Sequence, residues 1–226
     1  DEAMKIDMHF HVVGRGKDID QVNDQVFFYP EDNNTLLTSV LYRLVEKYLG
    51  KAGADFDQSG TIDTDEYLAL ICKYLSTSQE IDGVVLLALD ALYDPDSGEL
   101  DRTKTDLWVS NRFLSRKVKE LNDRLTSEGV PGKRFYWGAS VSPNRKDWEE
   151  EMEFVLNDPD AVLMKWIPSV QHIDLRNGKH NGYYESLARN KMPLLCHVGP
   201  EYSFPEGIRE KRRDDFRFLD KPLDCG

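Results

Sequence analysis

Five short apolar runs, separated by stretches with helical periodicity, constrain the fold of this chain most strongly. The runs have the length and composition of buried strands and cover residues 5–13, 83–89, 135–141, 161–167 and 193–198. Apolar positions at helical spacing lie between them, in residues 36–49, 67–75, 107–125, 148–156 and 183–188. Strands that alternate with helices pair in parallel through right-handed crossovers. The sequence therefore predicts an α/β fold, either a barrel or a doubly wound sheet.

The spacing of the runs indicates one elaborated domain. Residues 14–82 separate the first two runs, which is too long for a single crossover helix. We expect residues 30–80 to form a helical insertion above the carboxyl ends of the strands, where α/β folds place their active sites. No repeat or Pro- and Ser-rich linker divides the sequence, so we expect one domain over residues 1–226.

The charge of the chain argues against two classes of partner. Twenty-nine Lys and Arg against 41 Asp and Glu leave a net charge of −12, which disfavours non-specific attraction to nucleic acid or anionic membranes. The basic cluster at residues 209–213 runs directly into Asp214 and Asp215, and we interpret it as a solvated surface. No apolar run approaches the roughly 20 residues that cross a bilayer. We expect neither a nucleic-acid partner nor a membrane.

The cysteines indicate a reducing compartment. Cys72, Cys196 and Cys225 are scattered and odd in number, and no CxxC pair occurs. This usage fits neither a disulfide framework nor a zinc knuckle. The first ten residues, DEAMKIDMHF, lack the charged-then-apolar layout of a secretion signal. We expect a cytoplasmic protein.

Histidines in the first run indicate a metal site. Alternation along a strand sends His9 and His11 to one face together with Asp7. The opposite face is then expected to carry Ile6, Met8 and Phe10. A His-x-His pair on a strand can chelate one divalent cation, and neutral imidazole suits Zn, Fe, Ni or Cu better than Mg or Ca. By itself the pair is a weak signal, because many such pairs arise by chance.

A third histidine reinforces the first two. His197 stands at the end of the fifth run and is followed by Gly199 and Pro200, which end a strand and open a loop. A lone histidine in such a place is more often a hydrogen-bonded core residue than a ligand. Together, His9, His11 and His197 predict a metal site at the carboxyl ends of the strands.

With these residues the sequence resembles the amidohydrolase superfamily, in the branch often called amidohydrolase 2. The resemblance is carried by the His-x-His motif of the first run, the segment AVLMKWIPSVQHID at the fourth and PLLCHVGPEYSF at the fifth. It implies a (β/α)8 TIM barrel with zinc or another divalent transition metal at its mouth. His9, His11 and His197 match three of the family's ligands. The metal would activate a water that attacks an amide, ester or lactone carbonyl of a small-molecule substrate.

The resemblance also assigns residues on the fourth strand and after it. Lys165 falls where some branches carry a carboxylated lysine that bridges two metals, although an ordinary lysine lining the mouth fits as well. Substrate contacts are expected in the segment that follows Lys165, at Trp166, Gln171 and His172. For the last three, a position on the surface is the alternative.

The chain departs from the family at its carboxyl end. The family places a further histidine after the sixth strand and, after the eighth, an aspartate that ligates metal and accepts the proton of the attacking water. This sequence stops about where a sixth strand would begin, so the expected general base lies beyond Gly226. Five strands cannot close an eight-stranded barrel. We expect an incomplete barrel of about five βα units, in which Asp7 supports the ligands without replacing the base.

Residues 55–66, DFDQSGTIDTDE, fit the twelve-residue calcium loop of an EF-hand. The predicted calcium ligands are Asp55, Asp57, Ser59, Thr61, Asp63 and Glu66. EF-hands usually work in pairs, however, and no second loop is present. The alternative is an acidic loop in which Asp63 or Thr64 caps the following helix. A bound calcium ion would stabilise the insertion without taking part in chemistry.

Two further functions fit the same residues. Part of the same family uses the same ligands for non-oxidative decarboxylation of aromatic or unsaturated acids. The calcium-type loop and the missing base also fit a non-catalytic calcium-binding interaction module.

Overall fold

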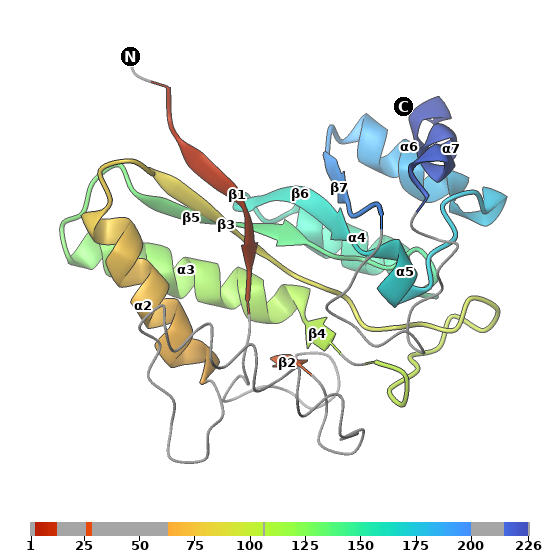
Figure 1. Ribbon diagram of the computed structural model, residues 1–226, viewed down its shortest axis with the longest axis horizontal. Helices are drawn as coiled ribbons and strands as arrows, with labels where there is room; N and C mark the ends of the chain where they lie inside the picture. Colours follow the sequence, from red (N-terminus) through yellow and green to blue (C-terminus); the bar gives the residue numbers. More distant parts are fainter. Residues whose placement is uncertain (1–2, 13–25, 29–62, 106, 200–214, 226) are drawn as a thin grey trace.

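A parallel sheet forms the centre of the protein, which is seen here in a computed structural model that describes residues 3–12, 26–28, 63–105, 107–199 and 215–225. The strands are β1 (Ile6–His11), β3 (Gly83–Leu87), β5 (Arg134–Ala139), β6 (Ala161–Trp166) and β7 (Leu194–Cys196). They lie side by side in chain order, and every neighbouring pair is parallel. The sheet curls into a half-barrel (Figure 1). The predicted α/β class and all five predicted strands are confirmed.

Helices cover one face of this sheet. The longer helices are α2 (Thr64–Thr77), α3 (Asn111–Ser127), α4 (Trp148–Leu156) and α6 (Asn181–Arg189). Shorter elements are α5 (Pro168–Gln171), η2 (Gly178–His180), η3 (Phe216–Leu219) and α7 (Asp220–Asp224). Four of the predicted helices are thus present, and the predicted helix at residues 36–49 lies outside the described residues.

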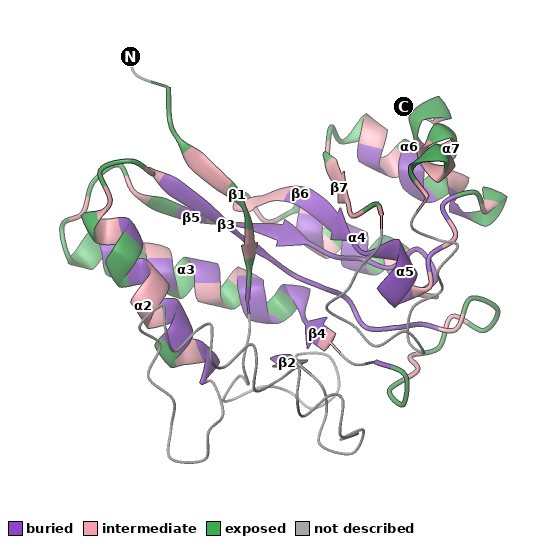
Figure 2. Ribbon diagram, viewed as in Figure 1, coloured by how far each residue is buried: buried purple, intermediate pink, exposed green. Residues whose placement is uncertain are grey.

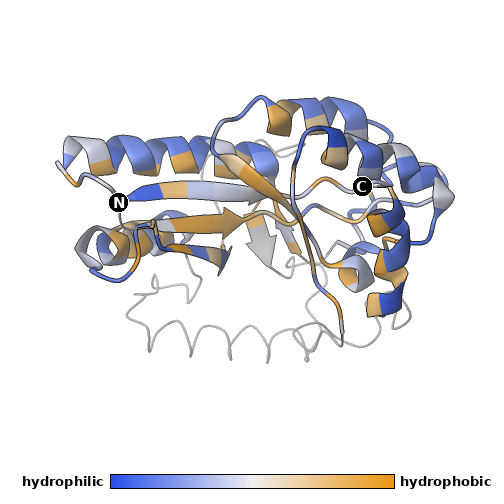
Figure 3. Cartoon of the chain, turned by 90° about the horizontal axis from the view of Figure 1, so that it is seen from above, coloured by the Kyte–Doolittle hydropathy of each residue, from blue (hydrophilic) through white to orange (hydrophobic). Residues whose placement is uncertain are grey.

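The two faces of the sheet carry two different apolar clusters. On the helical face, Val84 and Leu86 of β3 pack in the main core with Leu114 of α3 and Val155 of α4. On the concave face, Val85, Leu87 and Leu163 form a smaller cluster. All of β3 is therefore buried, as expected for a central parallel strand. Figure 2 shows the buried strands in purple, and Figure 3 shows both polar and apolar positions along the helices that cover them.

One predicted boundary is wrong. Helical periodicity was expected from residue 107, but Leu107–Val109 form strand β4, which pairs antiparallel with β2 (Val26–Phe28). Helix α3 begins only after Ser110, whose hydroxyl accepts a hydrogen bond from the Phe113 N–H. Trp108 and Val109 are buried, so their apolar character reflects burial in a strand. This small sheet brings part of the segment between β1 and β3 next to the carboxyl end of β3.

Candidate functional site

The predicted His-x-His pair lies at the carboxyl end of β1, where the strand is irregular. Its pairing with β3 shifts register between Asp7 and Phe10, and the Asp7 carboxylate accepts a hydrogen bond of 3.0 Å from the His9 N–H. As a result Ile6 packs on the concave face of the sheet, whereas Phe10 packs into the main core on the helical face. The expectation that both share one face is wrong, because a bulge reverses the alternation of side chains.

The bulge leaves the two imidazoles in contact. Nε2 of His9 lies 3.1 Å from Nε2 of His11, and the ring centroids are 4.9 Å apart. Two nitrogens that bind one tetrahedral zinc ion at roughly 2.0–2.1 Å would lie about 3.3 Å apart. The pair is therefore close to the geometry of two ligands to one metal ion, and its donor atoms suit zinc.

Lys165 on β6 and His197 just after β7 act electrostatically on this pair from the other side of the sheet order. Partial burial lowers the pKa of His9, and the positive charges of Lys165 and His197 lower it further, whereas Asp7 raises it. Lys165 of β6 is buried, and the His197 N–H donates to the Trp166 carbonyl oxygen over 2.9 Å, which extends the pairing of β7 with β6. In the described part of the chain no three His, Cys, Asp or Glu side chains are placed closely enough to hold a metal ion. The structure thus assembles the predicted pair and places Lys165 and His197 within electrostatic range of it.

Two of the three expected substrate contacts are buried and form hydrogen bonds within the protein. Trp166 is fully buried on the helical face, where its Nε1–H donates to the Val141 carbonyl oxygen and its ring packs against Tyr183. Gln171 is also buried, and its side-chain oxygen accepts the Ile167 N–H. Alternation along β6 turns Trp166 away from the face that carries Lys165, and the expected contacts of Trp166 and Gln171 with a substrate stay predictions.

His172 ends helix α5. It adopts a left-handed conformation (φ 54°) and is partly exposed, and its carbonyl oxygen accepts a hydrogen bond from the Asn144 amide. The structure shows this positional role, and the expected contact of its imidazole with a substrate stays a prediction.

The predicted calcium loop is described only at its end. Asp55, Asp57, Ser59 and Thr61 lie outside the described residues. Asp63 caps helix α2, where its carboxylate accepts hydrogen bonds from the Asp65 and Glu66 N–H groups, and Glu66 is exposed in the first turn. The alternative role of Asp63 as a helix cap is confirmed. An EF-hand loop also enters a helix at this point, so the cap is compatible with both interpretations.

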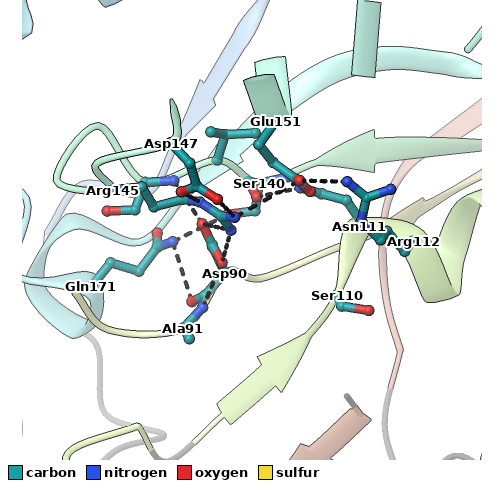
Figure 4. A network of polar contacts seen from close by, with 12 residues as sticks. Asp90, Ala91, Ser110, Asn111, Arg112, Ser140, Arg145, Asp147, Glu151 and Gln171 are labelled. Atoms are coloured by element: carbon teal, nitrogen blue, oxygen red, sulfur yellow. Dashed lines mark hydrogen bonds and ion pairs between the residues drawn. The ribbon is translucent and has the colours of Figure 1, made fainter. Parts of the chain in front are cut away.

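A buried ionic network, which the sequence analysis missed, lies where β3 and β5 end (Figure 4). The side chain of Asp90 is 2% exposed and that of Arg145 is 11% exposed. Arg145 Nη1 lies 3.2 Å from Asp90 Oδ1, while its Nε and Nη2 each donate to Asp147 over 2.9 Å. Asp90 also accepts the N–H groups of Ser142 and Ala91. Burial raises the pKa of Asp90, and the Arg145 charge acts in the opposite direction.

The network extends to the strand that carries Lys165. The Asn111 amide pairs with both backbone groups of Ser140 and also donates to Glu151. The Ser140 hydroxyl donates to the Lys165 carbonyl oxygen over 2.8 Å and accepts from Gln171. Together with Asp90 and Arg145, these residues therefore fix the loops after β3 and β5 to the last residue of α5. No short motif marks them, because their partners come from distant parts of the chain.

No protein-family model matches this sequence, and no match was found among curated proteins. No helix in the described residues is long and apolar enough to span a membrane.

Proposed function

We propose that this protein is a metal-dependent hydrolase that acts on an amide, ester or lactone of a small molecule. The observation that carries the proposal is the 3.1 Å separation of the His9 and His11 Nε2 atoms at the carboxyl end of a parallel strand. Carboxyl ends of parallel strands are where barrel enzymes place their catalytic groups. The five parallel strands form a curled sheet, and this curvature supports a (β/α)8 barrel in which these strands would be five of the eight.

The residues have distinct tasks in this proposal. His9 and His11 would hold a zinc or similar ion, with His197 as the third protein ligand and Asp7 holding the bulge through the His9 N–H. Such an ion polarises a carbonyl and lowers the pKa of its bound water to about 7. Lys165, which is buried and whose charge acts on His9, would supply positive charge that favours a polarised or anionic substrate group.

Metal analysis tests the proposal directly. The purified chain should retain about one equivalent of a transition metal after removal of loosely bound ions, and a His9→Ala/His11→Ala variant should lose it. His172→Asn is a matched control, because it removes an imidazole elsewhere and Asn tolerates the left-handed conformation of that position. If the wild-type chain takes up no transition metal after reconstitution, the proposal fails.

A decarboxylase is the second candidate, and the position of Lys165 favours it. An ammonium group within electrostatic range of His9 suits a substrate carboxylate. Product analysis separates the two reactions, since carbon dioxide release without consumption of water would exclude hydrolysis.

The third candidate is a calcium-binding interaction module. It is supported by the loop sequence at residues 55–66, with which the Asp63 cap of α2 is compatible. Under this hypothesis calcium would raise the melting temperature, whereas a zinc-selective chelator would change nothing. The three cysteines are free in the structure, which fits the cytoplasmic location that we propose for all three candidates.

A further inference from the structure

Tyr67 links helix α2 to the histidine pair. It lies in the first turn of α2, is 8% exposed, and donates its hydroxyl proton to the His11 carbonyl oxygen over 3.3 Å. Its ring also stacks on that of Phe10, with centroids 6.2 Å apart and planes 27° from parallel. One side chain thus contacts both the backbone of a predicted ligand and the residue between the two ligands.

The strand at this point needs such support. In the described sheet β1 pairs only with β3, and the register shift between Asp7 and Phe10 interrupts that pairing where His9 stands. The direction in which each imidazole points depends on the backbone dihedrals of this bulge. A contact that holds Phe10 and His11 therefore also sets the separation of the two Nε2 atoms.

Helix α2 is itself well anchored. Asp63 caps its first turn, Leu68 and Cys72 are buried in the main core, and Asp65 forms an ion pair of 3.0 Å with Lys117 of α3. Because α2 is fixed to both the core and α3, the Tyr67 hydroxyl has a defined position against which β1 can rest.

We propose that Tyr67 is a positioning residue for the metal site, acting through the His11 backbone and the Phe10 ring to hold His9 and His11 at the separation that one metal ion requires. This inference rests on the proposed function, because it assumes that the pair binds metal. It makes α2, whose first turn contains the end of the predicted calcium loop, part of the support of the site.

The test is the zinc affinity of the full chain, measured by competition with a chromophoric chelator. Tyr67→Phe keeps the ring on Phe10 and removes only the hydroxyl group, so we expect zinc binding to weaken about three- to tenfold, as loss of one hydrogen bond implies. The Co²⁺-substituted variant should also show a changed visible absorption spectrum. Tyr74→Phe, which removes a hydroxyl from a half-exposed tyrosine of the same helix, should leave both unchanged.

A double-mutant cycle separates positioning from general stabilisation. In a His11→Ala background the backbone carbonyl of residue 11 remains but its imidazole is gone, so Tyr67→Phe should then weaken zinc binding much less than it does in the wild-type background. A purely structural role would lower the unfolding free energy of the metal-free protein and leave zinc affinity and the Co²⁺ spectrum as in wild type.

The outcomes distinguish this inference from the function on which it rests. Wild-type affinity and spectrum in Tyr67→Phe, in a chain that binds zinc, would overturn the role of Tyr67 and leave the metal site intact. An equal loss of affinity in the presence and absence of the His11 imidazole would also overturn it. Failure of the wild-type chain to bind any transition metal would overturn the proposed function and this inference together.

Discussion

Replacing Arg145 by leucine should destabilise this protein more than any substitution of a surface charge. The guanidinium of Arg145 is the counter-ion of Asp90, whose side chain is 2% exposed, and it also neutralises Asp147. In Arg145→Leu, Asp90 keeps the N–H groups of Ser142 and Ala91 but loses its compensating charge. Removal of one partner of a buried ion pair costs about 3–5 kcal/mol, a large part of the roughly 5–15 kcal/mol that stabilises a typical domain.

Urea denaturation at pH 7, followed by circular dichroism, measures this loss. The matched control is Lys146→Leu, the neighbouring residue, whose ion pair with Glu99 is 63% and 65% exposed and should contribute at most about 1 kcal/mol. A second variant, Arg145→Leu/Asp90→Asn, removes the uncompensated charge and should recover part of the stability.

The pH dependence gives an independent check. Burial raises the pKa of Asp90, and loss of the Arg145 charge should raise it further. A carboxyl group whose folded-state pKa is raised binds its proton more tightly in the folded state, so the penalty of Arg145→Leu should shrink as the pH falls from 7 to 5. A loss no larger than that of Lys146→Leu, or one that is the same at both pH values, would refute this account of the network.

Three further predictions address other parts of the molecule. Burial raises the pKa of Tyr67 to about 12, so the stability that its protonated phenol contributes is complete below pH about 10 and is lost as the pH rises towards 12. Tyr67→Phe should therefore reduce the loss of unfolding free energy at alkaline pH by up to about 2–3 kcal/mol, measured by urea titrations. Gly138→Ala should lower the free energy of unfolding by about 1–3 kcal/mol, because its Cβ would lie 2.5 Å from Leu163 Cδ1 and 2.7 Å from Leu87 Cδ2. Gly182→Ala, whose Cβ would meet no atom within 4 Å, should instead stabilise α6 by about 0.5–1 kcal/mol. Equal effects of the two substitutions would contradict this account of the packing. If residues 55–66 bind calcium, millimolar calcium should raise the melting temperature of the wild type, and Glu66→Gln, which alters an exposed residue of α2, should abolish that rise.

The elements that the sequence predicted are those whose signal is local. Each strand of the sheet is a short, nearly continuous apolar run, and β3 is buried at all five positions. The error at residues 107–109 arose because Trp108 and Val109 also fit a helical spacing with the apolar residues of α3. Only their pairing with Val26–Phe28, some 80 residues away in the chain, makes them a strand.

The candidate site could be predicted only in part. His9 and His11 are two residues apart in one strand, so the sequence predicts that they share a face, whereas their close contact depends on the bulge. The burial of Trp166 on the helical face could not be foreseen, because its motif marks the segment without showing to which side each residue points. Asp90 and Arg145 could not have been paired from the sequence, since they are separated by 55 positions and meet only when β3 and β5 lie side by side.

By itself, therefore, the sequence determined the alternation of strands and helices, the acidic charge and the His-x-His pair, because burial and backbone periodicity act between residues close together in the chain. The tertiary structure decided which faces of the strands the side chains occupy, through the bulge after Asp7. It also decided that Tyr67 meets His11 and that Arg145 compensates the buried charge of Asp90. Contacts of this kind depend on the register and curvature of a sheet assembled from distant segments, and no local pattern records them.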